Sequence, residues 1–339
     1  MDKRVILSVA GSGKTTYIIS KLSNKKRSLI LTYTENNTEN IKNKIRNRFN
    51  GSIPSNINVM TFFSFLYNFC YKPLVFPDHP IKGICFKKPQ KYSQRFFLNE
   101  KYIFSWKISH LLENYLSNIC ERIARYYDEF VIDELQDIAS RDFHFLEELI
   151  KTIKIDVLLV GDFFQHTFDT SNDGFYYKNL HQNEQEYVNK LIKAGLQIDK
   201  ITLSKSFRCT KEVCNFIREK LGIEIESNSS ERSLIKEIIL KEEIDNILKD
   251  DNIVKLVYQN SKKYDFFAKN WGECKGEDKY VDVCVIMNKN TYQKYTCNKL
   301  KTLPQKTKNK LYVAITRARK NVLFIAEDKV KNWKKKNNR

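Results

Sequence analysis

Apolar runs of strand length recur along the first half of the chain, separated by longer polar or amphipathic stretches. The runs lie at residues 4–9, 28–34, 57–61, 130–133 and 156–161. Between the second and third runs, Asn36 to Phe49 is polar and basic with helical spacing of its few apolar residues. Strands that alternate with helices indicate a parallel α/β sheet.

Residues from about 70 to 125 interrupt this alternation. Pro73, Pro77, Pro80 and Pro89 crowd its first part, and a helical pattern runs from Ile103 to Tyr126. Basic and aromatic residues follow the prolines: Lys87, Lys88, Lys91, Tyr92, Arg95, Phe96 and Phe97. We expect a helical or irregular insertion. Its aromatic residues either contact a single strand of nucleic acid by stacking or belong to the core.

A second series of strand-like runs begins after Gln197, at residues 253–257, 281–287 and 322–325. Because 339 residues are long for one core, we expect two domains. The expected first domain spans residues 1–199 and the second residues 200–328. Residues 329–339 carry six basic side chains and are interpreted as a solvated tail or a contact to a nucleic-acid backbone.

Composition narrows the class of protein. Hydrophobic residues make up 42% of the chain, which supports packed domains, and no apolar run reaches the length of a membrane span. Eight cysteines without a Cys-x-x-Cys pair argue against a disulfide framework or a zinc site. We therefore expect a cytoplasmic protein with reduced thiols and no membrane partner.

The net charge of +19 produces a positive field over part of the surface. This charge either attracts nucleic acid or reflects a lysine-rich composition without a binding role, and charge alone leaves both interpretations open.

A phosphate-binding loop is indicated directly after the first apolar run. Its residues are Ala10, Gly11, Ser12, Gly13, Lys14, Thr15 and Thr16. The glycines let backbone N–H groups surround an anion, Lys14 supplies a positive charge for the outer phosphates, and the Thr15 hydroxyl is placed to bind magnesium. The strand–loop–helix context predicts a site for ATP and Mg²⁺ and disfavours the alternative of a plain glycine-rich turn.

Two carboxylates end the run at residues 130–133. In a chain with a phosphate loop, Asp133 is the candidate to hold magnesium through water, and Glu134 is the candidate base for the attacking water. The alternative is a solvated acidic turn. Gln165, just after the next apolar run, is the candidate to sense the terminal phosphate.

Together, these stretches resemble the ordered motifs of superfamily 1 helicases of the UvrD/Rep type, from about Val5 to Ile325. The matching stretches are residues 10–15, 31–34, 61–64, Asp133-Glu134-Leu135-Gln136-Asp137, residues 160–165, Ser206-Phe207-Arg208, Lys275-Gly276 and residues 312–319. A chance match to all of these in one order is not credible.

The resemblance implies two RecA-like P-loop NTPase domains with parallel sheets and with ATP between them. It implies that Arg208 and Arg317 act on the γ-phosphate and that Gly276 lies at the nucleotide. It also implies movement on single-stranded DNA, with DNA contacts from Thr32, Tyr33, Thr61, Phe62 and Phe63.

The chain departs from the family at four places. No counterpart of the adenine-reading glutamine motif precedes the phosphate loop, which leaves nucleotide selectivity undefined. Residues 166–171 replace an aromatic-Arg-Gly-Ala stretch, and Glu277-Asp278 stands where Leu-Glu is usual. About 60 residues separate Arg208 from Gly272, too few for the family's large accessory domain.

Our leading hypothesis is an ATP-dependent DNA helicase or translocase with DNA-stimulated ATP hydrolysis. The alternative is a helicase-derived ATPase switch that does not unwind, a subunit of a DNA repair or antiviral (anti-phage) defence complex with a protein partner such as a nuclease. An RNA helicase is a third interpretation.

Overall fold

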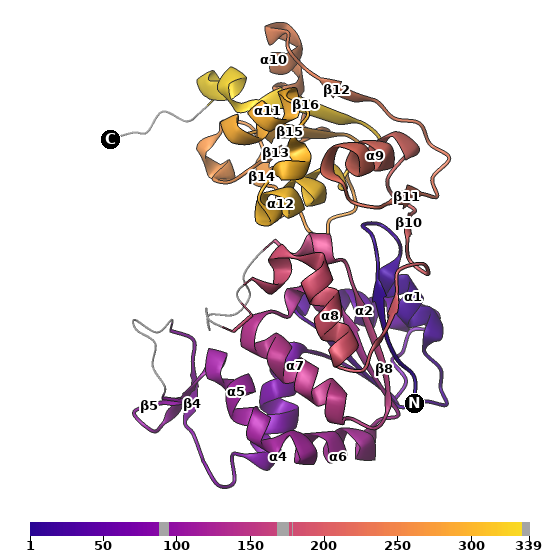
Figure 1. The fold of residues 1–339 in the computed structure, drawn as a ribbon, viewed down its shortest axis with the longest axis vertical. Coiled ribbons are helices and arrows are strands. Elements are labelled where there is room, and N and C mark those ends of the chain that lie inside the picture. The colour runs from indigo at the N-terminus through magenta and orange to yellow at the C-terminus, as the bar shows by residue number, and fades with distance from the viewer. Residues whose placement is uncertain (88–94, 168–175, 178, 334–339) are drawn as a thin grey trace. The chain divides into compact units, whose positions relative to one another are not determined.

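The computed structural model describes residues 1–87, 95–167, 176–177 and 179–333 (Figure 1). Its internal contacts divide the chain into two compact units. The first unit holds residues 1–7, 14–161 and the described residues between 176 and 200, and the second holds residues 8–13, 162–167 and 201–333. The chain therefore enters the second unit twice before residue 201.

The first unit is built on a six-stranded sheet in the order β3-β2-β7-β8-β1-β9, with every pair parallel. The strands are β1 Lys3–Leu7, β2 Ser28–Thr32, β3 Ile57–Thr61, β7 Glu129–Asp133, β8 Asp156–Gly161 and β9 Gln197–Asp199. All five residues of β2 are buried. A parallel sheet covered on both faces gives continuous apolar runs, and such runs identified five of the six strands in the sequence. The short edge strand β9, with an exposed Gln197, was not predicted.

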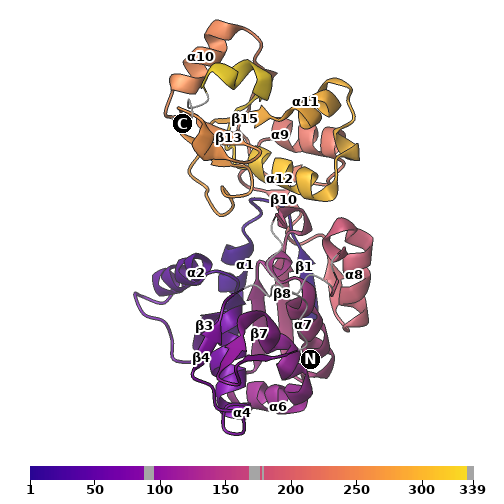
Figure 2. The same cartoon turned by 90° about the vertical axis from the view of Figure 1, so that its left-hand side faces the viewer.

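Helices flank this sheet, and in the view of Figure 2 the strands lie between α2 and α8. The principal helices are α1 Lys14–Lys21, α2 Glu35–Arg48, α7 Ser140–Thr152 and α8 Glu184–Lys193. Helix α2 begins where the Thr34 side chain accepts a hydrogen bond from the Asn37 N–H. Glu35 in its first turn and Arg48 in its last turn complement the helix dipole.

The expected insertion is only partly helical. It contains the π-helix η1 Phe65–Tyr71, α4 Lys72–Leu74, α5 Ile108–Leu112, α6 Leu116–Tyr126 and a small sheet of β4 Gly83–Cys85, β5 Phe97–Leu98 and β6 Tyr102–Phe104. The helix expected from Ile103 is therefore wrong at its start, because residues 102–104 pair with β4 and β5 instead. Lys88, Lys91 and Tyr92 lie outside the described residues.

The second half of the insertion belongs to the core of the first unit. Helices α5 and α6 pack against α7. Ile108, Leu112, Ile119 and Ile123 are fully buried. Their helical spacing therefore marks a core face, whereas Phe96 and Phe97, for which the sequence left stacking or core open, are only partly buried.

The second unit has a five-stranded parallel sheet in the order β12-β16-β15-β13-β14. The strands are β12 Ile235–Glu237, β13 Val254–Val257, β14 Ala268–Asn270, β15 Val283–Met287 and β16 Val322–Ala326, and the main helices are α9 Lys211–Phe216, α10 Lys241–Lys249, α11 Lys289–Thr296 and α12 Gln305–Ile315. A two-stranded ribbon of β10 Lys205–Ser206 and β11 Glu226–Ser227 is separate.

Alternate residues of β15 contribute to two different cores. Val283, Val285 and Met287 pack with residues of α9 and α12, whereas Cys284 and Ile286 pack with residues of α10. The sheet is thus covered on both faces, which explains the uninterrupted apolar run of β15.

The expected basic tail is wrong for its first five residues. Residues 329–333 belong to the 3₁₀ helix η10 Glu327–Trp333, in which Val330 is fully buried. Trp333 donates its indole N–H to Asp245 Oδ1 at 3.0 Å and packs on Phe266. An apolar residue and an indole within the basic run anchor it, while residues 334–339 lie outside the described chain.

All eight cysteines are free thiols, and Cys297 is the exposed one. Among the described residues, no helix combines the length and apolar character that crossing a membrane demands.

Candidate functional site

Residues 10–13 of the predicted phosphate loop, with Ser8 and Val9 before them, lie in the second unit. Gly11 and Gly13 have φ angles of +71° and +81°. A Cβ atom at Gly11 would lie 2.7 Å from both Arg208 Cβ and Ser206 Oγ. Glycine is required there for the backbone angle and for the close approach of residues 206–208.

A buried chain of hydrogen bonds joins this loop to two other motifs. The Ala10 N–H donates to the Tyr312 hydroxyl at 2.9 Å, and that hydroxyl donates to Asp162 Oδ2 at 3.1 Å. Gln165 Nε2 donates to the same carboxylate oxygen at 2.8 Å. Burial and the nearby Asp162 carboxylate raise the pKa of Tyr312 well above its usual value, so the hydroxyl stays a donor.

Ser12 offers a polar atom that suits a phosphate. Its side chain is 2% exposed, and its Oγ has no hydrogen-bond partner among the described residues. A buried hydroxyl without a partner costs free energy, which a bound anion would offset. The loop residues therefore fit a nucleotide phosphate.

Lys14 and Thr15 begin α1 in the first unit and face the carboxylates that end β7. Lys14 Nζ lies 3.9 Å from Glu134 Oε1. The Thr15 hydroxyl donates to Asp133 Oδ2 at 2.9 Å. Thr16, the last residue of the predicted loop, is exposed. The structure thus brings together the four residues for which the sequence predicted phosphate, metal and base roles.

Asp133 and Glu134 differ in environment. Burial and the neighbouring Glu134 carboxylate raise the pKa of Asp133 to about 6. Glu134 has a left-handed backbone (φ +58°), and Gln136 Nε2 donates to its Oε2. A buried carboxylate beside a hydroxyl forms a set of hard oxygen ligands, which fits Mg²⁺.

Arg208 and Arg317 lie together in the second unit. Arg317 is 1% exposed and donates to the carbonyls of Val313 and Glu277. Both guanidinium groups face Asp278: Arg208 forms an ion pair with it, and Arg317 Nη1 lies 3.8 Å from its Oδ1. Burial and the Arg317 charge lower the pKa of Arg208.

Gly276 precedes Glu277 and Asp278 and has φ +84°. Apart from its chain neighbours, no atom of the described residues lies within 4 Å of a Cβ placed there. The left-handed backbone therefore explains why a glycine stands at this position.

Thr32 and Thr61, two of the predicted DNA contacts, use their side-chain hydroxyls in hydrogen bonds to nearby residues of the chain. The Thr32 hydroxyl hydrogen bonds to the Thr38 hydroxyl at 2.6 Å, and the Thr61 hydroxyl accepts from the Ser64 N–H at 3.1 Å. Both residues are buried, because each ends a strand and orders the helix that follows.

The predicted aromatic contacts divide into exposed and buried rings. Phe62 is 1% exposed and lies against Phe65, so the prediction that it stacks on a base does not fit this structure. Tyr33 and Phe63 are partly exposed at the ends of β2 and β3. Phe63 lies 5.6 Å from the ring of Phe86, which is 65% exposed. Phe63 and Phe86 therefore offer aromatic surface that Phe62 does not.

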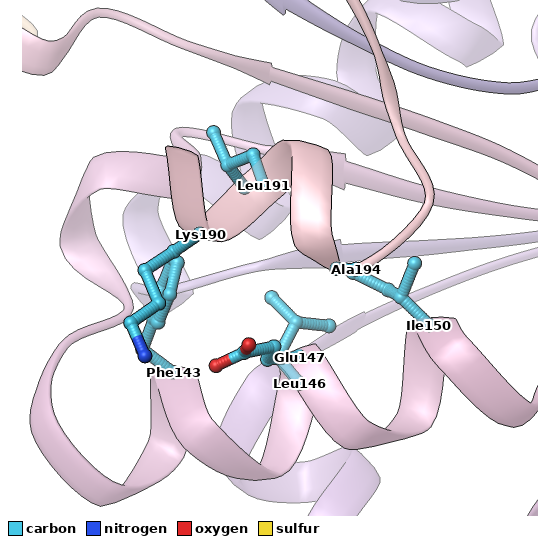
Figure 3. A pocket seen from close by; sticks show the side chains of 7 residues that line it. All are labelled: Phe143, Leu146, Glu147, Ile150, Lys190, Leu191 and Ala194. Atoms are coloured by element: carbon cyan, nitrogen blue, oxygen red, sulfur yellow. The ribbon is translucent and has the colours of Figure 1, made fainter. Parts of the chain in front are cut away.

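A pocket in the first unit is lined by residues of α7 and α8 and by Ala194, just after α8 (Figure 3). Its walls are mainly apolar, with Glu147 and Lys190 as the polar exceptions. Lys190 Nζ donates to the Tyr177 hydroxyl, which in turn donates to Glu147 at 2.8 Å. The polar groups of this pocket are thus already bridged within the chain.

Sequence reasoning assigned no role to Tyr312, Asp162, Gln136 or Asp278. The first three stand inside the quoted motifs, and Asp278 stands where the chain departs from the fifth motif. A place in or beside a motif indicates that a residue has a role but does not identify its hydrogen-bond partner. That partner can lie far away in the sequence, as Ala10 and Tyr312 do at 302 residues apart. No local pattern reveals such a pairing.

Two family models match the sequence. The model described as viral superfamily 1 RNA helicase core domain matches residues 112–326, and the model described as UvrD/REP helicase N-terminal domain matches residues 2–74. A comparison with curated proteins found no match.

Solved structures resemble the fold at low sequence identity. An arterivirus nonstructural protein 10 (helicase) in complex with DNA matches with a TM-score of 0.50 and 12% identity over 97% of this chain and 62% of its own. The PRRSV helicase matches with a TM-score of 0.48 and 13% identity, over 96% of this chain and 52% of its own. The chain thus spans about half to three fifths of the length of these structures. With two parallel sheets observed, the expected α/β fold of two RecA-like units is confirmed.

Proposed function

The chain belongs to the superfamily 1 helicases, as the order of its motifs predicts, and from this premise we propose that it couples ATP hydrolysis to movement along single-stranded DNA. The observation that carries the proposal is the cluster of Lys14, Thr15, Asp133 and Glu134. A lysine and a hydroxyl at the start of a helix, facing two carboxylates at the end of a strand, suit the hydrolysis of a nucleoside triphosphate.

Each residue of this cluster has a proposed task. Lys14 and the N–H groups of the loop bind the outer phosphates, and Glu134 accepts a proton from the attacking water. Thr15 and Asp133 would hold Mg²⁺, which neutralises charge on the phosphates when bound. Gln165 orients the water or the γ-phosphate, and Arg208 and Arg317 stabilise the charge that develops in the transition state.

DNA is the proposed track because the phosphate-loop end of the chain matches a UvrD/REP model. The partly exposed rings of Tyr33 and Phe63 and the net charge of +19 support binding of a single strand of nucleic acid of either kind.

The test is ATP hydrolysis by the purified chain with and without single-stranded DNA. We expect stimulation by DNA in the wild type and in Lys21→Ala, an exposed lysine of the same helix. Lys14→Ala should lose roughly 10²–10³-fold in turnover, since it removes a charge aimed at the phosphates. Normal turnover in Lys14→Ala would refute the site.

RNA is a second candidate track, favoured by the description of the family model that matches residues 112–326. Competition between a DNA strand and an RNA strand of the same sequence distinguishes the two. Stronger stimulation of hydrolysis by RNA at equal concentration would replace DNA in the proposal.

The compact second unit favours a further candidate, an ATPase switch that does not unwind. Between Arg208 and Gly272 the structure has only short elements. They are the helices α9, η7 Ile217–Leu221, α10 and η8 Ser261–Lys263 and the strands β11, β12, β13 and β14. Such a switch suits a subunit of a repair or anti-phage complex with a nuclease partner. DNA-stimulated hydrolysis without strand displacement on a forked duplex would favour this candidate, and displacement would exclude it.

A further inference from the structure

The Asp278 carboxylate contacts both of the arginines that are proposed to act on the γ-phosphate. Arg208 Nη2 donates to Asp278 Oδ1, and Arg317 Nη1 lies 3.8 Å from the same oxygen atom. One negative charge thus faces two positive charges, which would repel each other more strongly without it. All three residues belong to the second unit, so these contacts lie within one compact part of the chain.

The three side chains differ in their access to solvent. The Arg317 side chain is buried and that of Arg208 is largely buried, whereas the Asp278 side chain is 58% exposed. Backbone carbonyls accept further hydrogen bonds from the two arginines, namely those of Thr316, Val313 and Glu277. The carboxylate is therefore the solvent-facing partner of the two cations, and another anion can replace it without opening the core.

The backbone that carries Asp278 is held on both sides of its side chain. The Glu277 carbonyl accepts a hydrogen bond from Arg317 at 3.3 Å, and the Asp278 carbonyl accepts one from Arg319 Nε at 2.8 Å. The Glu277 carboxylate has a different partner, because it accepts from the Tyr280 hydroxyl. The Asp278 carboxylate can thus leave the arginines by a rotation of its own side chain, while the backbone stays in place.

Arg208 lies beside the phosphate loop within the second unit. A Cβ atom at Gly11 would lie 2.7 Å from Arg208 Cβ, and the Phe207 N–H donates to the Gly11 carbonyl at 2.9 Å. A phosphate group near this loop is therefore close to the arginine that now binds Asp278. Because a guanidinium group uses the same fork of donors for a carboxylate and for a phosphate, the two anions compete for it.

We propose that Asp278 is an internal counter-ion that the γ-phosphate displaces when it binds Arg208 and Arg317, and that this exchange lowers the affinity for ATP relative to ADP. The proposal rests on the proposed function, because it concerns the same two arginines. ADP has no γ-phosphate and leaves Asp278 in place, so its affinity is independent of this carboxylate. Asp278 is thus a positioning residue that acts through the arginines.

The experiment measures the affinity of the full chain for ADP and for the non-hydrolysable ATP analogue adenylyl imidodiphosphate, by calorimetric titration with Mg²⁺ present. Asp278→Asn keeps the size of the side chain and removes its charge. We expect the analogue to bind about tenfold more tightly and ADP to bind as it does to the wild type. In steady-state hydrolysis the KM for ATP should fall by a similar factor with kcat nearly unchanged, because the exchange takes place during binding.

Glu242→Gln is the matched control. Glu242 is exposed on α10 of the same unit, so neutralising it should change the affinity for neither nucleotide. In an Arg208→Gln background, Asp278→Asn should lose most of its effect, because the direct partner of the carboxylate is gone. Asp278→Ser, a second neutral variant, should repeat the result of Asp278→Asn. An equal gain in affinity for ADP and for the analogue would show a general effect of charge and overturn the proposal.

The remaining outcomes separate this inference from the proposed function. Weaker binding of the analogue by both neutral variants would show that the carboxylate supports the arginines rather than competes with the γ-phosphate, which refutes the exchange. If the wild type hydrolyses ATP and Asp278→Asn has unchanged affinities, the exchange also fails and the proposed function stands. If the wild type neither binds nor hydrolyses ATP, the proposed function fails and the inference fails with it.

Discussion

Gly11 and Gly51 share a left-handed backbone but differ in their surroundings. Gly51 has φ +91° and no atom within 4 Å of a Cβ, whereas a Cβ at Gly11 would meet Arg208 and Ser206 at 2.7 Å. We expect Gly51→Ala to lower the free energy of unfolding by about 1 kcal/mol, from backbone strain alone. Gly11→Ala should lower it further, since residues 206–208 must also move. Chemical denaturation of both variants measures the difference, and equal losses would contradict the close packing at Gly11.

Glu134 is the residue that we propose as the base. We expect Glu134→Gln to bind ATP with nearly normal affinity and to release phosphate about 10²–10⁴ times more slowly, because an amide cannot accept the proton. Single-turnover phosphate release together with equilibrium ATP binding measures the two effects. Glu121→Gln, on the exposed side of α6, is the control. Rapid phosphate release from Glu134→Gln would assign the base to another residue.

At the scale of elements, the Tyr312 hydroxyl on α12 accepts a hydrogen bond from the Ala10 N–H of the phosphate loop and donates one to Asp162. Asp162 in turn accepts a hydrogen bond from Gln165. Tyr312→Phe keeps the ring but leaves the Ala10 N–H and Asp162 without this hydroxyl. We expect ATP turnover to fall about tenfold, the equivalent of about 1.4 kcal/mol, with a smaller change in KM, since Gln165 is held through the same carboxylate. Tyr295→Phe, a partly buried tyrosine of α11, is the control. Unchanged turnover in Tyr312→Phe would exclude this positioning role.

The sequence predicted long helices and strands buried on both faces of a sheet better than it predicted short elements. Strands β2 and β15 were evident because every residue is buried, and α2 was evident from its polar periodicity. Strands β4, β5 and β6 have two or three residues each, too few for a period to register. Likewise, Lys14, Thr15, Asp133 and Glu134 follow from local motifs, whereas the pairing of Asp278 with two arginines depends on tertiary contacts that spacing does not encode.

At the scale of the whole molecule, acid should destabilise the fold through His110. Burial and the charges of Arg141, Lys107 and His144 lower its pKa to about 4, and its ring packs against Phe96. Between pH 6.5 and pH 4 the unfolded chain binds a proton that the folded chain does not, so stability falls as the pH falls through this window. The pKa of His144 is also lowered, which adds a loss in the same direction.

His110→Phe should reduce this loss, and His79→Phe, at an exposed histidine, should not. Urea denaturation of both variants at pH 4.5 and pH 7 makes the comparison. An equal loss in His110→Phe and the wild type would show that other groups govern the acid sensitivity.

The second unit draws Val9 and Ala10 into a core that otherwise consists of residues from 164 onward. During translation these two residues leave the ribosome long before Val322 and Phe324, which pack in the same core. Until residues from Leu203 onward emerge, this part of the nascent chain lacks the partners that bury it, because the Val9 N–H donates to the Leu203 carbonyl and Cys209 and Val213 pack in the same core. The phosphate loop therefore takes its final shape only late in synthesis, so a truncated polypeptide should not acquire a competent nucleotide site.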